Sequence, residues 1–98
     1  MIRAEFDGTV IAESDETIVV EGNHYFPRES LRAEYLRPSK AVSLCYWKGL
    51  ARYHSIEVGD RRMGHAAWYY PWPLPWVHKI KDRVAFGPGI RVHEVTGS

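Results

Sequence analysis

The chain has 98 residues, of which 45% are hydrophobic and 26% are charged, and these proportions are typical of a globular protein. Its length fits one domain, which we expect to span residues 1–98, and its formal net charge of +1 gives no overall field that would favour nucleic acid or an anionic membrane. The lone Cys45 excludes an intrachain disulfide, and no apolar run approaches the roughly 18 residues of a membrane-spanning helix. We therefore expect a cytoplasmic protein with neither a membrane nor a nucleic acid as partner.

Strand signals dominate the first 27 residues. Stretches of β-branched or alternating residues are separated by the turn residues Asp7-Gly8 and Glu21-Gly22-Asn23. The predicted strands cover residues 1–6, 9–12, 17–20 and 24–26. They indicate a meander of three or four short strands.

Residues 28–36 are ambiguous. Leu31 and Tyr35 lie four residues apart, as they would on one face of a short helix. Pro38 would end such a helix, because the residue before a proline is biased away from helical conformation. Helix and strand both remain open for this stretch.

The second half of the chain returns to alternating strands. These are predicted at residues 41–46, 50–58 and 64–70. The segment from Pro71 to Trp76 has three prolines, which lack an amide donor, so we expect a semi-rigid loop with two tryptophans there. Residues 84–86 and 90–95 are predicted to pair as a closing hairpin around a Gly-Pro-Gly turn.

This succession of short strands and turns predicts the fold class. It is mainly β, a single-domain antiparallel sheet arrangement that is sandwich-like, tent-like or barrel-like. At most one or two short helical turns are expected in it.

A thiol and an amine three residues apart are the first candidates for chemistry. If their side chains met, the cationic Lys48 would favour the thiolate of Cys45 and make it a nucleophile. Lys48 could equally bind a phosphate or a carboxylate. The simpler interpretation makes Cys45 a small buried hydrophobic residue and Lys48 a turn residue.

Two further segments could contact a ligand. Arg28 follows a proline and could present its guanidinium group to an anion, or it could form a surface ion pair with Glu29. Further on, alternation places Trp68 and Tyr70 on one face of a strand and Tyr69 on the other. Such aromatic density would either stack against a planar ligand or pack the core.

The sequence indicates no metal site and no identifiable cofactor. Its five histidines have no metal-binding spacing, and there is no second cysteine to complete a zinc site. Neither a Walker motif nor a G-x-G-x-x-G stretch occurs.

Taken in order, these segments resemble domain-of-unknown-function family 427 over nearly the whole chain. The resemblance is carried by Phe26-Pro27-Arg28, by C-x-x-K-G-x-A-x-Y from Cys45 to Tyr53, and by W-x-Y-P-x-P from Trp68 to Pro73. Tyr46 stands where the family commonly has proline. The resemblance implies a mainly β fold with tent-like sheets, similar to those of methionine sulfoxide reductase B, and fold alone does not transfer an activity.

A nucleotidyltransferase label is also attached to the family. That activity normally needs paired carboxylates for magnesium and a loop that cradles phosphates, and neither is found in the sequence. The resemblance further implies that Arg28, Cys45 and Lys48 share one site.

These observations give a leading hypothesis of a domain that binds a small anionic or planar ligand in a cleft of a β-sheet. Lys48 and Arg28 would supply charge, and the aromatic contacts would come from Phe26, Tyr53, Trp68 and Tyr70. One alternative is an enzyme with Cys45 and Lys48 as catalytic residues. Another is a protein-interaction module that uses the Trp72–Trp76 loop, including as a homodimer.

Overall fold

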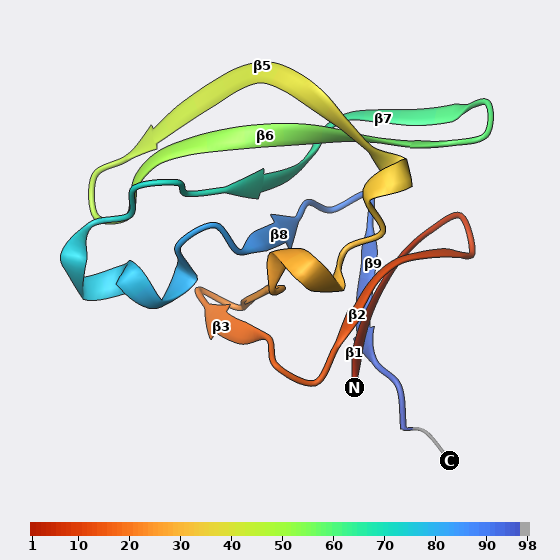
Figure 1. Ribbon diagram of the computed structural model, residues 1–98, viewed down its shortest axis with the longest axis horizontal. Coiled ribbons are helices and arrows are strands. Elements are labelled where there is room, and N and C mark those ends of the chain that lie inside the picture. The colour runs from red at the N-terminus through yellow and green to blue at the C-terminus, as the bar shows by residue number, and fades with distance from the viewer. Residues whose placement is uncertain (97–98) are drawn as a thin grey trace.

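The structure is a computed structural model that describes residues 1–96, and these form three antiparallel sheets (Figure 1). The strands are β1 (Ile2–Phe6), β2 (Thr9–Ser14), β3 (Ile18–Val20), β4 (Asn23–Tyr25), β5 (Leu36–Cys45), β6 (Gly49–Val58), β7 (Arg61–Tyr69), β8 (Val84–Phe86) and β9 (Arg91–Glu94). Short 3-10 turns lie at η1 (Arg28–Ser30), η2 (Ala33–Tyr35) and η3 (Pro75–Ile80). The mainly β, antiparallel fold class is confirmed, and the strands within residues 1–96 close no barrel.

The largest sheet has the strand order β5-β6-β7-β8 and lies across the top of Figure 1. Below it lie the sheet of order β2-β1-β9 and the β3–β4 hairpin. The backbone of Phe26 continues the large sheet beyond β8, because Phe26 and Val84 exchange two hydrogen bonds of 2.8 and 3.0 Å. The four-stranded sheet is thus bordered on one side by Phe26 and on the other by the edge strand β5.

The ambiguous stretch 28–36 contains no α-helix. It consists of η1 and η2, after which β5 begins at Leu36. Between the two turns the chain is bound to β2, because the amide of Arg32 donates to the carbonyl of Ile11 at 2.8 Å. That contact interrupts any helix before it could span the stretch.

The predicted closing hairpin is wrong. β8 pairs with β7 and β9 pairs with β1, so the two segments belong to different sheets. The Gly-Pro-Gly turn is present, and the Ile90 amide donates to the Gly87 carbonyl at 3.0 Å. All three residues of β8 are buried, whereas the residues of β9 are exposed or partly exposed. The two strands therefore occupy different environments in the fold.

Two hydrophobic clusters fill the molecule, and β7 contributes to both. Ala67 and Tyr69 face the larger cluster between the large sheet and the β1–β2–β9 sheet. Trp68 and Tyr70 face the smaller one, which includes Tyr25. The predicted alternation of these aromatic residues is therefore confirmed. No helical segment within residues 1–96 has the length and hydropathy needed to cross a membrane.

Candidate functional site

Lys48 lies in the turn of the β5–β6 hairpin, and its side chain folds back into the protein. Only 7% of its surface is exposed. Its ammonium group forms a short ion pair with Glu21 from the β3–β4 turn. It also lies 5.4 Å from the ring centroids of both Trp47 and Tyr70. The predicted anion-binding charge is thus already compensated inside the protein.

The electrostatic surroundings keep Lys48 protonated. Burial by itself would lower the pKa of its ammonium group, but the hydrogen bond to Glu21 and the nearby Tyr25 and Tyr70 hydroxyls raise that pKa above its ordinary value. Burial also raises the pKa of Tyr70, so that this phenol stays neutral at pH 7. In this arrangement Lys48 is a buried cation paired with Glu21.

The hairpin turn depends on a glycine at position 49. Gly49 has a φ of +116°, and a Cβ atom there would lie 3.1 Å from the Trp72 carbonyl oxygen. The amide of Leu74 donates to the carbonyl of Lys48 at 2.9 Å on the same side. Glycine is needed because the backbone is left-handed and the neighbouring loop approaches closely.

Cys45, Tyr53 and Trp68 all pack against the smaller cluster that contains Tyr25 and Tyr70. The indole of Trp68 donates a hydrogen bond to the Tyr25 hydroxyl at 3.2 Å. The ring of Tyr53 lies 6.5 Å from that of Trp68 in a tilted arrangement. Five predicted residues, namely Cys45, Lys48, Tyr53, Trp68 and Tyr70, therefore lie in one region.

Arg28 lies elsewhere. Its guanidinium carbon is 4.6 Å from the centroid of Tyr69, whereas Lys48 lies against Tyr70. Because successive residues of an extended chain point to opposite faces, the two cations lie on opposite sides of the chain where β7 ends at Tyr69 and continues into Tyr70. The structure therefore does not bring Arg28 together with Cys45 and Lys48.

Phe26 is also separate from that region. It is fully buried in the larger cluster, and its ring meets that of Phe86 edge-on at 5.4 Å. A side chain with no exposed surface can contact a ligand only if the core opens.

His54 was not singled out from the sequence, yet its side chain is a direct partner of Arg28. The guanidinium Nη1 donates to His54 Nε2 at 3.3 Å, and the imidazole stacks on Tyr69 with 5.0 Å between ring centroids. Burial and the Arg28 charge lower the pKa of His54. Its Nδ1 atom is buried and forms no hydrogen bond within residues 1–96.

A hollow of about 220 Å³ borders Arg28. Its lining residues are Pro27, Arg28, Glu29, Lys81, Asp82 and Arg83. Acidic and basic side chains alternate there, and Arg28 Nε is already bound to the Asp82 carbonyl at 3.2 Å. The hollow offers a ligand no concentrated positive charge.

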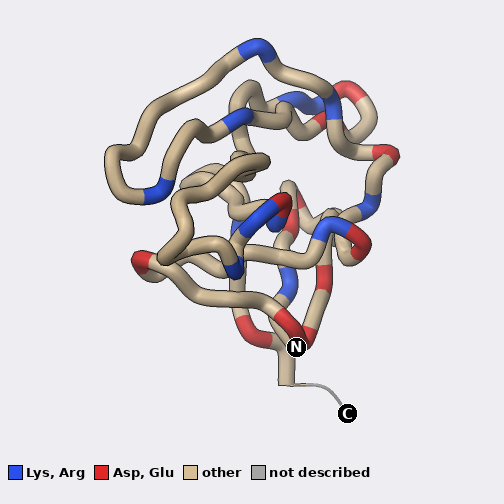
Figure 2. The backbone as a smooth tube through the Cα atoms, turned by 60° about the vertical axis from the view of Figure 1, so that its left-hand side comes forward, with Lys and Arg blue, Asp and Glu red and all other residues tan. Residues whose placement is uncertain are grey.

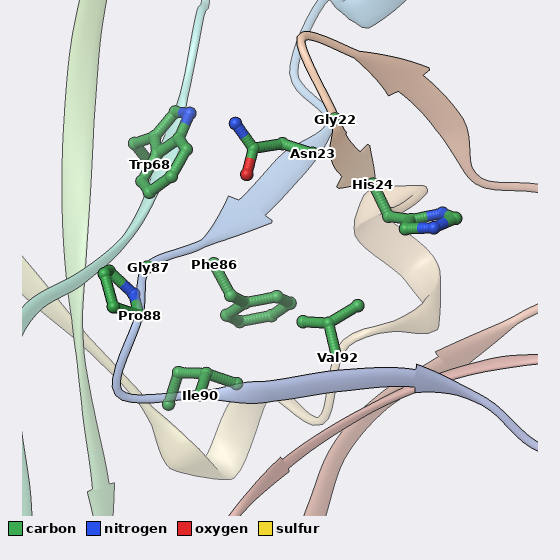
Figure 3. Close-up of a pocket in the computed structure, with 9 residues that line it drawn as sticks. All are labelled: Gly22, Asn23, His24, Trp68, Phe86, Gly87, Pro88, Ile90 and Val92. Atoms are coloured by element: carbon green, nitrogen blue, oxygen red, sulfur yellow. The ribbon is translucent and has the colours of Figure 1, made fainter.

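A cleft with a volume of about 390 Å³ lies between the β3–β4 hairpin, β8 and β9 (Figure 3). Its lining residues are Gly22, Asn23, His24, Trp68, Phe86, Gly87, Pro88, Ile90 and Val92. In Figure 3 the Trp68 indole stands on one side, and the side-chain amide of Asn23 extends toward it. Phe86, Ile90 and Val92 form an apolar floor. None of the lining residues is Asp, Glu, Lys or Arg.

Of the predicted site residues, only Trp68 lines this cleft. Asn23 appeared in the sequence as a turn residue, and Phe86 as part of a terminal strand. These two residues are far apart along the chain, and only the packing of the β3–β4 hairpin beside β8 brings them together. No local pattern could have identified them as neighbours.

The side chains of residues 1–96 contain no group of three or more His, Cys, Asp or Glu that could hold a metal ion. The expectation that there is no metal site remains a prediction.

The fold and cleft define a small antiparallel β domain with a hollow that holds no Asp, Glu, Lys or Arg in its lining. Residues 1–97 match the family described as a domain of unknown function, DUF427, and the chain belongs to that family. No curated protein matches the chain significantly. The family expected from the ordered motifs is thus confirmed.

Cys45 provides a direct test of the enzyme alternative. We expect its thiol to react with iodoacetamide at pH 7 more slowly in the folded protein than a small model thiol does, because it is partly buried and the nearby ammonium group is paired with Glu21. Mass spectrometry over time would measure the rate, with urea-unfolded protein as the control. A rate above that of the model thiol would contradict this expectation and support a nucleophilic cysteine.

Proposed function

We propose that this domain binds a small planar ligand, uncharged where it contacts the protein, in the cleft beside Trp68. The observation that carries the proposal is the 390 Å³ hollow, which places an indole beside a side-chain amide over an apolar floor. Ligand sites of this size are usually apolar with a few polar groups that fix orientation. Trp68 would stack on the ring, and the Asn23 amide would both donate and accept hydrogen bonds at its edge.

The absence of charged residues from the lining supports a planar ligand over an anionic one. Desolvating an anion without a compensating charge is costly. The two cations expected to hold an anion are engaged elsewhere, Lys48 with Glu21 and Arg28 with His54 and the Asp82 carbonyl. A heteroaromatic ring such as a nucleobase, nicotinamide or isoalloxazine fits the lining better than a phosphate group does.

The free thiol of Cys45 suits a reducing compartment, so the proposal places this binding in the cytoplasm. The small molecule is the only partner that the proposal requires.

The experiment is a thermal-shift screen against adenine, guanine, nicotinamide and riboflavin, with ribose 5-phosphate as an anionic comparison. A ligand present at 100 times its Kd should stabilise the fold by about 2.7 kcal/mol. For a domain of this size that raises Tm by roughly 10–20 °C. Asn23→Ala and Trp68→Phe should reduce the shift, whereas Trp72→Phe, which alters an exposed tryptophan outside the cleft, should leave it unchanged.

Two results would overturn the proposal. One is a screen in which none of the planar compounds raises Tm. The other is a shift that survives both cleft substitutions, since binding would then take place elsewhere.

A further inference from the structure

One end of the molecule exposes a group of large apolar side chains. It is formed by the β5–β6 hairpin and the loop that follows β7, seen together at the left of Figure 1. Tyr46 is 93% exposed, Trp72 70%, Leu44 66% and Trp76 65%. We call this end the aromatic tip, and define it by its exposed residues Val42, Leu44, Tyr46, Trp47, Leu50, Trp72 and Trp76.

The aromatic tip is a built surface in which two segments are bonded together. The Leu74 amide donates to the Lys48 carbonyl at 2.9 Å, and the Trp76 indole donates to the Trp47 carbonyl at 2.6 Å. The Lys48 amide in turn donates to the Cys45 carbonyl at 3.2 Å. These bonds satisfy backbone groups that would otherwise oppose transfer of the tip into an apolar medium.

Segments 44–50 and 71–76 of the aromatic tip present no exposed charge of their own. Lys48 is the only charged residue in segments 44–50 and 71–76. Its ammonium group is withdrawn beneath the surface and paired with Glu21. The outermost surface of the tip is therefore apolar and aromatic.

Exposed basic side chains lie on the segments that approach the tip, and the overall net charge of +1 does not reveal this local distribution. The counter-ion of Lys48, Glu21, is the half-exposed carboxylate beside them. In Figure 2 several acidic residues lie near the N-terminus, and others lie at the left and right of the view. Lys40, Arg52 and Lys79 are exposed on the segments that lead to the tip.

We propose that the aromatic tip docks on the surface of an anionic phospholipid membrane. Trp and Tyr side chains favour the boundary between headgroups and acyl chains, and flanking Lys and Arg are attracted to anionic lipids. The apolar tip would enter that boundary while Lys40, Arg52 and Lys79 stay at the headgroups. The expectation that there is no membrane partner came from the net charge and the lack of a spanning segment. A spanning segment is not needed for peripheral docking, and the proposal rests on the local charge beside the tip instead of the net charge.

The charge distribution argues against two other partners for the tip, a second copy of the chain and a nucleic acid. Two copies joined tip to tip would bring two positively charged regions together. A nucleic acid would need free basic side chains interleaved with the stacking rings, and in segments 44–50 and 71–76 the one basic residue, Lys48, is buried and paired with Glu21. The proposal is independent of the cleft beside Trp68.

The test is co-sedimentation of the full chain with phosphatidylcholine vesicles that contain about 30 mol% phosphatidylserine, compared with vesicles of phosphatidylcholine alone. We expect binding to the first kind only, weakened by salt. The double variant Trp72→Ser and Trp76→Ser should lose about tenfold or more in affinity. Arg52→Gln and Lys40→Gln should each lose about fivefold. Val19→Ser, which alters an exposed apolar residue of β3 outside the tip, is the matched control and should bind normally.

Sedimentation that is absent, or equal with and without phosphatidylserine, would overturn the proposal. So would binding that the tryptophan double variant retains. Analytical ultracentrifugation and a fluorescent single-stranded oligonucleotide are run alongside. Tip-dependent dimerisation or oligonucleotide binding without vesicle binding would replace the membrane with that partner.

Discussion

Replacing Phe26 with alanine should lower the free energy of unfolding by about 3–5 kcal/mol, the usual cost of truncating a buried phenylalanine. The side chain has no exposed surface and meets Phe86 edge-on in the larger cluster. The backbone amide and carbonyl of Phe26 are both hydrogen-bonded to Val84. The backbone therefore cannot easily move to fill the void that the substitution would leave. Urea unfolding followed by circular dichroism would measure the loss, and Phe26→Leu should cost markedly less.

This substitution also distinguishes packing from ligand contact. Phe26 was a candidate ligand-binding residue because it belongs to the Phe26-Pro27-Arg28 motif. Its complete burial gives another explanation for a phenylalanine at this position, which is packing of the core. We expect the Phe26→Leu variant to retain any ligand affinity of the wild type when measured well below its Tm. Lost affinity with little loss of stability would show that Phe26 contacts the ligand after all.

The second large effect concerns the ion pair between Lys48 and Glu21. Glu21→Gln should cost about 2–4 kcal/mol, because it leaves a buried ammonium group without its counter-ion. Lys48→Met should cost less, about 1 kcal/mol, since the side chain of Glu21 is 47% exposed and can be hydrated. The double variant should resemble Lys48→Met alone. Equal costs for the two single variants would contradict the asymmetry of burial.

The pH dependence of the Glu21→Gln variant gives an independent check. In the wild type the pKa of Lys48 is raised in the folded state, so the stability from this pair is fully present below pH 10.5 and is lost only as pH rises further. Without Glu21, burial should lower that pKa below 10.5, so the unfolded state would bind more protons and stability should rise with pH toward 10. Unfolding curves of both proteins at pH 7, 8.5 and 10 would show whether the free energy of unfolding rises with pH in the variant and not in the wild type.

The strands could be predicted because their signals are local. Alternation placed Trp68 and Tyr70 on one face of β7 and Tyr69 on the other, and the structure agrees. The Asp7-Gly8 turn is also a local signal. Both residues adopt positive φ, and the turn joins β1 to β2 as expected. A period of two residues and a turn dipeptide need no knowledge of the rest of the chain.

What could not be predicted depends on contacts between distant segments. Val84–Phe86 was expected to pair with the segment that follows it, because nothing local reveals that β7 is its partner. Lys48 looked like a free cation until the fold placed Glu21 beside it. Asn23 and Phe86 became neighbours in a cleft only through the packing of two sheets. Each case requires the sheet order, which strand propensity does not encode.

The pairing of β1 with β9 has a consequence for the way the protein is made. Strand β1 lies between β2 and β9, and the amide of Val95 donates to the carbonyl of Met1 at 2.7 Å. During synthesis β1 and β2 leave the ribosome early, yet one edge of β1 stays unpaired until β9 has also emerged. The larger cluster, which needs this sheet as one wall, is therefore completed only after residues 91–94 have been made. Such long-range closure is slow compared with local pairing, and in that interval the free edge of β1 is open to pairing with another chain.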